Sequence, residues 1–299
     1  MLYLPQTMPC IETLKAEGAE VAVYNLSDAT RLGAFPPDVK RVLLLNLMPQ
    51  KAVTELDIAR QMTARPGGVA LLPMKIAGQT YKTTPQSHMD ALYLDFEAYE
   101  HGVYDAMIIT GAPLECMPFE QVRYWDALCR IMTWADHHIL RSTLYICWAA
   151  QAGLYHHYGI DKYALPAKMF GIFSQEVLLP SCPLFAGLGS AFPMPGSRHT
   201  AVSVAETQEA GLTLGAVSAE SGLGVALTAD CRRVFITGHL EYEPNTLDNE
   251  YRRDVAKGLP IGLPLHYYHG DDPALGVDFS WAQAARRFYG NWLDLPESL

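Results

Sequence analysis

The feature that most constrains the fold is a series of short, almost continuously apolar segments rich in Val, Ile and Leu. Each has the length of a strand, and none shows the strict alternation of apolar and polar residues expected when one face is in water. Such runs are typical of parallel strands that are covered by helices on both faces. The segments expected to form strands are Val21–Leu26, Val42–Leu47, Val69–Pro73, Ala106–Thr110, Thr143–Cys147 and Val234–Thr237.

Helix-like segments lie between these runs, at Thr54–Met62, Phe119–Ala135 and Ala149–Tyr158. This alternation predicts an α/β fold with a doubly wound, mostly parallel sheet. The stretch 160–225 is rich in Pro and Gly and less periodic, so loops and short strands around a substrate pocket are expected there. A further helix is expected at Trp281–Leu293. No linker is evident, and we interpret residues 1–299 as one domain with a C-terminal extension packed on it.

Composition and motifs exclude several classes. A net charge of -10 disfavours nucleic acid as a partner, although it permits a local basic pocket for a phosphorylated ligand. The six cysteines form no C-x-x-C pair, which argues against a zinc site and favours a reducing compartment. Neither a signal-peptide pattern nor an apolar run of membrane-spanning length occurs, so a cytoplasmic protein is expected. Dinucleotide and P-loop motifs are also missing from the sequence.

Cys147 ends one predicted strand and is followed directly by a predicted helix. A thiol at this junction meets unpaired N–H groups and a partial positive charge, which favour a thiolate and can bind an oxyanion. Small residues usually flank such a nucleophile; Ala149 fits this pattern and Tyr145 does not. Because free cysteines are also common in protein cores, this segment alone leaves catalysis and core packing equally open.

A second segment supplies the groups that a cysteine nucleophile requires. The strand that ends at Thr237 is followed by Gly238, His239, Leu240 and Glu241. A nucleophilic cysteine needs a base, and the base needs a carboxylate to orient it. His-x-Glu after a strand provides both, whereas a surface loop with a chance His and Glu is the alternative for this segment taken singly. Paired with Cys147, His239 and Glu241 become candidate catalytic residues.

Two more predicted strands end in polar residues. Lys51 follows Asn46-Leu-Met-Pro-Gln, and Glu115 follows Thr-Gly-Ala-Pro-Leu. Parallel strands bring their carboxyl ends to one edge of the sheet, where open α/β folds build their binding sites. The alternative for Lys51 is a solvated lysine at the start of a helix. We expect the four strand ends to converge on one cleft.

Together these pieces resemble the homoserine O-acyltransferases of the MetA type. The fold of that family is flavodoxin-like and similar to the class I glutamine amidotransferases. The matching segments span most of the chain in the family's order: NLMPQKAVTE (46–55), TGAPLE (110–115), STLYICWAAQAGLYHHYGI (142–160), AKMFGIF (167–173), SRHT (197–200) and TGHLEYEPNTLDNEYRRDVAKGL (237–259).

The resemblance implies roles for single residues. The positions that match are Cys147 as the acyl-thioester nucleophile, His239 as the base, Glu241 as its partner, Lys168, Ser197 and Arg253 as substrate-binding residues, Glu115 as a selector of the acyl group, and Lys51 beside the active site. Without the resemblance, Lys168 and Ser197 carry weak signals, and Arg253 would be read as part of a surface salt bridge on a helix beside Arg252. The sequence departs from the family pattern at Gln50, at Leu240, at Ala149 and after Trp281. Only the departure after Trp281 bears on contacts, because it puts those of the C-terminal segment in doubt.

The implied reaction transfers an acetyl group from acetyl-CoA to the hydroxyl of L-homoserine, in methionine biosynthesis. An acyl-enzyme on Cys147 carries the group, the N–H of Trp148 helps to hold the oxyanion, and acyl-CoA is a substrate with no metal or bound cofactor. Glu115 would repel a succinyl carboxylate at a cost of about a few kcal/mol, which favours acetyl-CoA. Succinyl-CoA as donor stays open, as does L-serine as acceptor for cysteine biosynthesis, since one methylene gives only about 1–3 kcal/mol of discrimination.

Two other classes fit the sequence less well. A glutamine amidotransferase-like hydrolase would share the triad, but no synthase domain is evident and Tyr145 stands where amidotransferases favour glycine. A sensor or binding protein with an inactive triad would not need Cys147, His239 and Glu241 together. The expected partners are acetyl-CoA and a small hydroxy amino acid, with no nucleic acid and no membrane. A homodimer is compatible with the family analogy, and no sequence feature indicates it.

Overall fold

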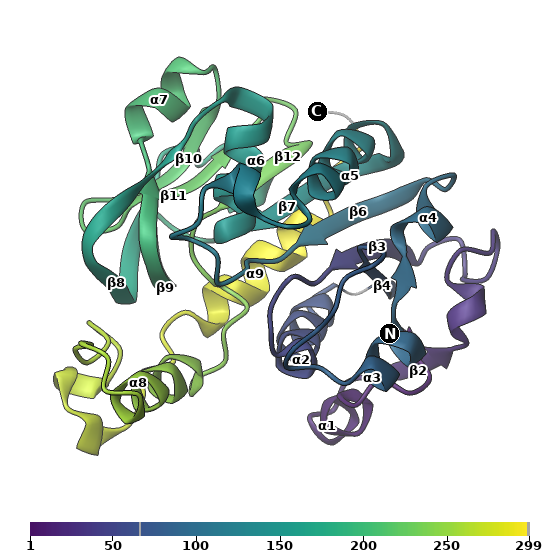
Figure 1. The fold of residues 1–299 in the computed structure, drawn as a ribbon, viewed down its shortest axis with the longest axis horizontal. Helices are drawn as coiled ribbons and strands as arrows, with labels where there is room; N and C mark the ends of the chain where they lie inside the picture. The colour runs from purple at the N-terminus through teal and green to yellow at the C-terminus, as the bar shows by residue number, and fades with distance from the viewer. Residues whose placement is uncertain (66, 298–299) are drawn as a thin grey trace.

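The computed structural model describes residues 1–65 and 67–297, and the strands of this part of the chain form one twelve-stranded sheet (Figure 1). The strands are β1 (Leu2–Pro5), β2 (Val21–Tyr24), β3 (Lys40–Leu45), β4 (Val69–Lys75), β5 (Leu94–Asp95), β6 (Tyr104–Ile109), β7 (Ile139–Ile146), β8 (Lys162–Val177), β9 (Ala191–Val202), β10 (Thr213–Ser218), β11 (Gly222–Leu227) and β12 (Arg233–Ile236). Their order across the sheet is β2-β1-β4-β3-β6-β7-β12-β11-β10-β8-β9, and β5 pairs with β4.

The sheet has a parallel and an antiparallel half. Every neighbouring pair from β2 to β12 is parallel. From β12 to β9 the pairs are antiparallel. The expected mostly parallel α/β sheet is therefore confirmed. The carboxyl ends of β3, β6, β7 and β12 lie side by side at one edge of the parallel half.

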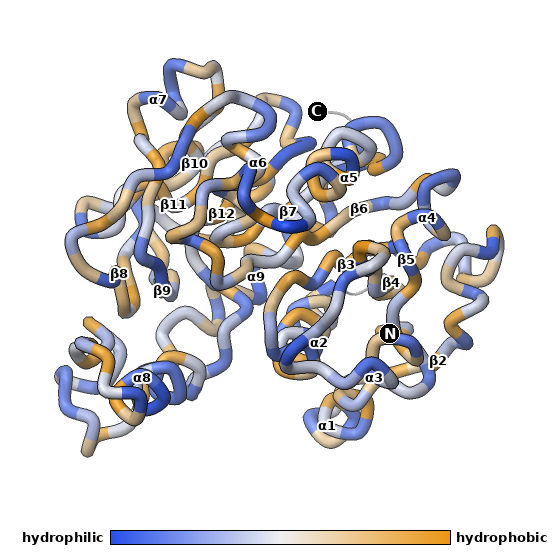
Figure 2. The backbone as a smooth tube through the Cα atoms, in the orientation of Figure 1, coloured by the Kyte–Doolittle hydropathy of each residue, from blue (hydrophilic) through white to orange (hydrophobic). Residues whose placement is uncertain are grey.

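Helices cover both faces of the parallel half. The helices are α1 (Ile11–Ala16), α2 (Lys51–Met62), α3 (Gln86–Leu92), α4 (Phe96–Tyr99), α5 (Trp125–His138), α6 (Trp148–Tyr158), α7 (Val204–Glu209), α8 (Thr246–Ala256) and α9 (Ala282–Leu293). Successive strand residues point to opposite faces, so Leu44 packs with α1, α2, α3 and α9, whereas Leu43 packs with α4, α5 and α6. Figure 2 shows the hydrophobic colour concentrated along these central strands.

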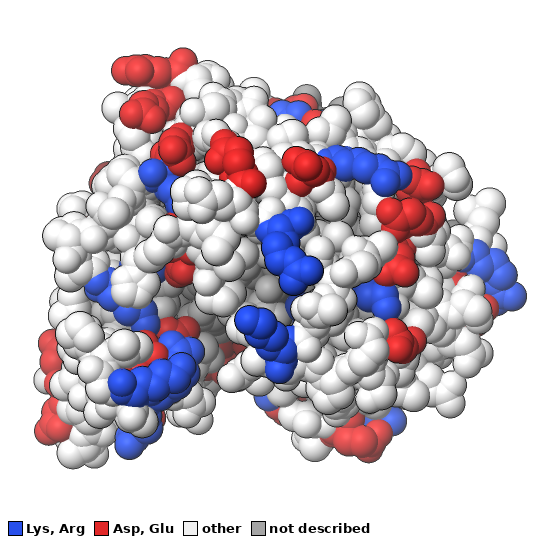
Figure 3. All heavy atoms as spheres, in the orientation of Figure 1, with Lys and Arg blue, Asp and Glu red and all other residues white. Residues whose placement is uncertain are grey.

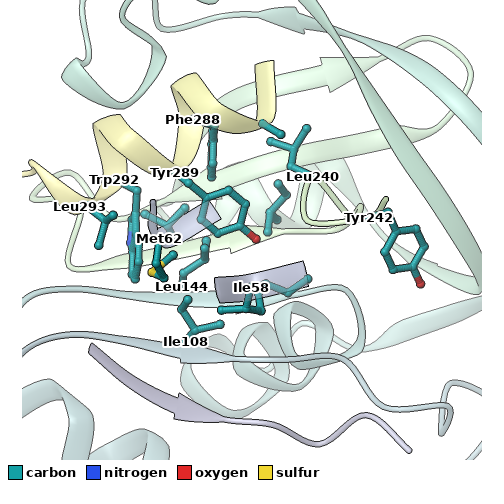
Figure 4. Packing of buried hydrophobic residues seen from close by; sticks show 14 of the residues in the cluster. Ile58, Met62, Ile108, Leu144, Leu240, Tyr242, Phe288, Tyr289, Trp292 and Leu293 are labelled. Carbon is teal, nitrogen blue, oxygen red and sulfur yellow. The ribbon is translucent and has the colours of Figure 1, made fainter. Parts of the chain in front are cut away.

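The C-terminal helix α9 belongs to the first of these two cores. Figure 4 shows its apolar side chains facing both α2 and the central strands; the labelled residues are Ile58, Met62, Ile108, Leu144, Leu240, Tyr242, Phe288, Tyr289, Trp292 and Leu293. The expected helix at Trp281–Leu293 is confirmed, with Trp281 as its N-cap. Among the described residues, no helix is both long and apolar enough to cross a membrane.

All six expected strands are present, with shifts of up to four residues at their ends. Cys147 was placed in a strand, but β7 ends at Ile146 and Cys147 is the turn residue that follows it. The helix expected at Phe119–Ala135 is divided into a 3-10 turn at Phe119–Gln121 and α5 from Trp125. The short strand β1 was missed, because four residues carry too little pattern to be recognised.

The expectation of loops and short strands over residues 160–225 was wrong in its main element. β8 has 16 residues and β9 has 12, and together they form a long antiparallel hairpin. The prolines of this segment suggested loops. They are tolerated because β9 is the edge strand, and on its outer side Pro193 and Pro195 do not interrupt a ladder by lacking an N–H.

A small lobe made of α8 and the segment after it stands apart from the body, below the ends of β8 and β9 in Figure 1. Leu265 joins this lobe to β8: its N–H donates to the Phe170 carbonyl at 2.9 Å, and its carbonyl accepts from the Ile172 N–H at 2.8 Å. A Cβ on Gly171 would lie 2.4 Å from the Leu265 oxygen, so this close approach requires glycine.

Candidate active site

Cys147 occupies a strained turn between β7 and α6. Its φ of 53° and ψ of -113° are sparsely populated by residues with a side chain, and such strain is common at functional sites. Two hydrogen bonds hold the turn: the Cys147 N–H donates to the Ile236 carbonyl at 2.8 Å, and the Cys147 carbonyl accepts from the Gln151 N–H at 3.2 Å. The predicted strand-to-helix turn is therefore present, and Cys147 is 5% exposed.

Tyr145, which the pattern of small residues disfavours, points away from this turn. Its ring stacks on Phe235 with 4.9 Å between centroids. A Cβ on Gly153 of α6 would lie 2.9 Å from the Tyr145 ring, so the glycine that makes room for α6 stands in the helix rather than beside Cys147. Ala149, buried in the same helix, also allows the close approach of α6 to the sheet.

Two backbone N–H groups lie near the Cys147 side chain. Gly111 follows β6, and a Cβ on it would be 3.3 Å from the Cys147 Cβ and 3.6 Å from the Trp148 nitrogen. Within residues 1–65 and 67–297, the N–H groups of Gly111 and Trp148 have no hydrogen-bond acceptor. Unpaired donors at a helix start are suited to hold an oxyanion. The Trp148 indole is buried beside Phe119 and Tyr124, so this residue combines packing with a backbone donor.

His239 and Glu241 form a buried pair after β12. The His239 Nδ1 is 2.6 Å from a Glu241 carboxylate oxygen, which leaves Nε2 for the cysteine. Burial lowers the pKa of His239, but the neighbouring Cys147 and Glu241 side chains outweigh this effect, and the pKa stands well above its usual range. The Tyr289 hydroxyl of α9 donates to the other Glu241 oxygen at 3.5 Å. The loop is fixed by the His239 N–H, which donates to the Pro195 carbonyl at 2.8 Å.

A buried arginine also acts on this site and was not singled out from the sequence. Arg198 of β9 is 2% exposed, and its guanidinium donates to the carbonyls of Ser221 at 2.5 Å and Thr237 at 3.4 Å. It forms no ion pair with a carboxylate in the described part of the chain. Burial lowers the pKa of Arg198, and the Cys147 side chain is the leading group that opposes this shift. Arg198 therefore adds positive charge to the surroundings of Cys147.

Asp57 of α2 lies behind the His239–Glu241 pair and was likewise missed. Its carboxyl is buried, 3.9 Å from the Arg60 guanidinium. Burial, the largest cause, together with the charges of Glu241 and Glu243, raises the pKa of Asp57 to about 8, although Arg60 and His239 act in the opposite direction. The sequence gives no signal for Asp57, since an Asp within a helix usually lies on the solvated face.

The three predicted substrate-binding residues lie around two carboxylates of α8. Lys168 contacts Glu250 and Asp254, both at 3.2 Å. The Ser197 hydroxyl donates to Glu250 at 2.6 Å, and the Arg253 Nε donates to Asp254 at 2.7 Å.

Tyr242 joins this cluster to the His239–Glu241 pair. Its hydroxyl donates to Glu250 at 3.3 Å, and its ring lies against His239. Neither Glu250 nor Tyr242 was singled out from the sequence, although the i, i+3 and i, i+4 spacing of Glu250, Arg253 and Asp254 places them on one face of a helix. The structure therefore brings the substrate-binding candidates next to His239.

Lys51 and Glu115 lie on the other side of Cys147, beyond Gly111. The Lys51 ammonium is buried and donates to the carbonyls of Asn46 at 2.6 Å and Met48 at 2.9 Å. Burial lowers its pKa to about 8, which the charge of Glu55 partly opposes. Glu115 is half-buried and forms no hydrogen bond within the described residues; its charge acts on Lys162 at the start of β8.

The described residues contain no group of three or more His, Cys, Asp or Glu side chains placed to hold a metal ion. The reactive groups of the site are thus a thiol, an imidazole–carboxylate pair and backbone donors. Such a set can attack a carbonyl carbon, hold the resulting oxyanion and move one proton.

Comparisons with known proteins agree with this geometry. Residues 1–296 match the sequence profile of the homoserine O-succinyltransferase family. A homoserine O-acetyltransferase of Bacteroides fragilis is 48% identical over 296 residues, which cover 98% of this chain and 94% of the relative. One from Desulfovibrio desulfuricans is 42% identical over 298 residues, covering 98% of this chain and 92% of the relative. The resemblance inferred from the motifs is confirmed.

Solved structures confirm the expected fold. A glutamine amidotransferase from Thermotoga maritima has a TM-score of 0.57 at 11% identity and covers 85% of this chain and 96% of its own. Another, from Methylobacillus flagellatus, has a TM-score of 0.54 at 11% identity, covering 85% of this chain and 94% of its own. At this level of identity the likeness concerns the fold alone.

Proposed function

We propose that this chain, which belongs to the homoserine O-succinyltransferase family and is an acyltransferase, transfers an acetyl group from acetyl-CoA to the hydroxyl of L-homoserine, a step of methionine biosynthesis. The observation that carries the proposal is the position of Cys147, at a strained turn beside the His239–Glu241 pair. The full-length relatives named homoserine O-acetyltransferase support the choice of donor and acceptor.

In the first half-reaction the Cys147 thiolate attacks the carbonyl carbon of acetyl-CoA. The oxyanion that forms accepts hydrogen bonds from the N–H groups of Trp148 and Gly111, which have no other acceptor among the described residues. The bond to the CoA sulfur then breaks, and the His239 imidazolium gives its proton to the departing thiolate. One thioester replaces another, so this step is nearly balanced in free energy.

In the second half-reaction His239 acts as the base. It takes the proton of the homoserine hydroxyl as the oxygen attacks the acetyl carbon, and the Cys147 thiolate leaves. Glu241 fixes the imidazole tautomer through Nδ1 and stabilises its charged form. The raised pKa of His239 suits a group that must hold a proton next to a thiolate.

The cluster around α8 provides the groups that an amino acid requires. Arg253 can bind the α-carboxylate, because a guanidinium presents parallel donors to two oxygens. Glu250 already accepts from Ser197, Tyr242 and Lys168, and its carboxylate can bind the α-ammonium of the acceptor. His239 lies against the Tyr242 ring and Glu250 contacts the Tyr242 hydroxyl, so an amino acid bound at Glu250 would lie close to His239.

Glu115 favours acetyl-CoA over succinyl-CoA on electrostatic grounds. A succinyl group would bring a second carboxylate towards a half-buried Glu115, and two like charges in a partly dry site cost about a few kcal/mol. The substitution Glu115→Gly should therefore raise the ratio of kcat/KM for succinyl-CoA to that for acetyl-CoA, whereas Glu97→Gly, at an exposed position of α4, should leave that ratio unchanged. An unchanged ratio in Glu115→Gly contradicts the role of Glu115.

A matrix of donors and acceptors tests the proposed function. Acetyl-CoA and succinyl-CoA are each combined with L-homoserine and L-serine, and CoA release is followed; glutamine hydrolysis is measured beside them, because the fold is that of amidotransferases. The proposal predicts the highest kcat/KM for acetyl-CoA with L-homoserine. A preference for L-serine or succinyl-CoA would change the assigned substrate, and glutaminase activity without CoA release would contradict acyl transfer.

A further inference from the structure

A cavity of about 310 Å³ lies over the carboxyl ends of β3 and β4, and the reaction steps above leave it unused. Its floor is formed by Leu45 and Asn46, and its walls by the segments 47–51, 75–83 and 112–114 with Tyr124. The surface that faces the cavity is mainly apolar, although the polar residues Asn46, Lys51, Gln79, Thr80 and Thr83 also line it. A cavity of this size and character takes the stem of an organic ligand rather than a compact polar one.

The cavity is adjacent to Cys147 through the loop after β6. Ala112 lines the cavity, and its neighbour Gly111 is the residue whose Cβ would lie 3.3 Å from the Cys147 Cβ. The strand order explains this arrangement, since β4, β3 and β6 lie on one side of β7, whereas β12 and the β8–β9 hairpin lie on the other. The cavity and the α8 cluster therefore approach Cys147 from opposite sides.

Internal contacts hold the cavity walls formed by the segments 47–51 and 75–83 in place. The Lys51 ammonium, fixed by two carbonyls, lies 5.1 Å from the centre of the Tyr81 ring. The hydroxyls of Thr83 and Thr84 both donate to the Pro49 carbonyl, Thr84 at 3.1 Å. The segment 75–83 is thus tied to the segment 47–51, and the cavity between them is formed before any ligand arrives.

The mouth of the cavity carries positive charge on an acidic protein. Lys82 is exposed and has no hydrogen-bond or ion-pair partner among the described residues, and Lys75 is half-buried beside Asp90 at 3.3 Å. Figure 3 shows Lys and Arg side chains gathered near the hollow in the middle of this face. Because the net charge is -10, a polyanionic ligand requires such a local basic edge.

We propose that this cavity binds the pantetheine arm of acyl-CoA, and that Lys82 and Lys75 at its mouth contact the phosphates of the nucleotide end. This inference rests on the proposed function. In this arrangement the two substrates bind on different sides of Cys147. The pantetheine arm lies over β3 and β4 and places its thioester beyond Gly111, whereas the acceptor binds on the β12 side. Homoserine can then reach the acetyl-enzyme without crossing the path by which CoA departs.

Two variants test the two parts of the site. Thr80 is an exposed lining residue, and Thr80→Trp fills the cavity without disturbing the core. We expect its KM for acetyl-CoA to rise tenfold or more, with the KM for homoserine unchanged. Lys82→Met should raise the KM for acetyl-CoA severalfold and leave the KM for acetylpantetheine, which has no phosphates, unchanged. Lys15→Met, at an exposed position of α1, is the matched control and should change neither KM.

The outcomes distinguish this inference from the proposed function. Acetylation of the enzyme by phenyl thioacetate, a small donor that needs no cavity, should proceed equally in wild type, Thr80→Trp and Lys82→Met. A wild-type chain that no thioester acetylates contradicts the proposed function. If wild type is acetylated but the acetyl-CoA kinetics of Thr80→Trp and Lys82→Met are both unchanged, the cavity assignment alone is contradicted. The same holds if Lys82→Met raises the KM for acetylpantetheine as much as the KM for acetyl-CoA.

Discussion

The ring of Tyr242 lies parallel to the imidazole of His239, with 4.1 Å between the ring centroids and 11° between the ring planes. The Tyr242 hydroxyl reaches Glu250 on α8, and the Tyr242 carbonyl accepts from the Trp281 indole at 2.8 Å. Tyr242 therefore joins the base, the acceptor cluster and the C-terminal segment. The departure from the family pattern after Trp281 leaves this contact in place.

Two substitutions at Tyr242 separate stacking from hydrogen bonding. Tyr242→Phe keeps the ring on His239 and loses the bond to the Glu250 carboxylate, worth about 1.5–3 kcal/mol. We expect a rise of roughly tenfold or more in the KM for homoserine, with acetyl-enzyme formation unchanged. Tyr242→Leu should also slow acetylation, because the imidazole loses its support. Single-turnover acetylation and steady-state kinetics measure the two effects, and slower acetylation in Tyr242→Phe would contradict the distinction.

Gly111 should be needed for the oxyanion site. A Cβ at this position lies 3.3 Å from the Cys147 Cβ, so Gly111→Ala requires the loop after β6 or Cys147 to shift, and we expect that shift to misalign one backbone donor. The loss of such a donor lowers kcat by about 10²–10³. Rapid-quench measurement of acetylation gives the effect, and Gly262→Ala, which meets no atom within 4 Å, is the control. Normal acetylation by a folded Gly111→Ala enzyme would remove Gly111 from the mechanism.

Arg198 should stabilise negative charge at Cys147. Arg198→Met removes the buried cation, and we expect alkylation of Cys147 by iodoacetamide at neutral pH to slow roughly tenfold. Arg198→Lys keeps the charge and should retain most of the reactivity. Circular dichroism identifies any variant that has lost its fold, since the carbonyls of Ser221 and Thr237 lose their donor. Equal alkylation rates in a folded Arg198→Met chain and in wild type would show that the guanidinium has no such effect.

Asp57 gives the stability of the chain an unusual pH dependence. Its pKa rises from 3.8 to about 8 on folding, mainly through burial. Between these values the folded chain holds a proton that the unfolded chain has released, so the contribution of Asp57 to stability falls as pH rises through this window and is fully lost above about pH 8. Asp57→Asn removes the effect, and its unfolding free energy relative to wild type should increase from pH 5 to pH 9.

Urea unfolding at several pH values measures this difference. Asp90→Asn provides the control, because hydrogen bonds from Gln86 and Lys75 lower the pKa of the exposed Asp90. Its difference from wild type should show no such rise with pH. A constant difference for Asp57→Asn across the range would mean that Asp57 is ionised in the folded chain.

The parallel half of the sheet and the candidate catalytic residues could be singled out from the sequence because their signals are local. Buried parallel strands are apolar throughout, and Cys147 and His239-x-Glu241 each follow one. The β8–β9 hairpin was not predictable in the same way, since an edge strand tolerates the prolines that indicate loops elsewhere. Arg198, Asp57 and Tyr242 act through contacts between distant segments, and a single sequence does not reveal which solvated-looking residue becomes buried.

The most direct test of the account is the intact mass of the enzyme mixed with acetyl-CoA in the absence of acceptor. We predict a mass increase of one acetyl group, located on Cys147 by peptide mapping and lost when L-homoserine is added, with the release of O-acetylhomoserine. Cys147→Ala should form no adduct and should lose transfer. Transfer at the normal rate by Cys147→Ala, or an acetyl group on another residue that homoserine accepts, would contradict the account.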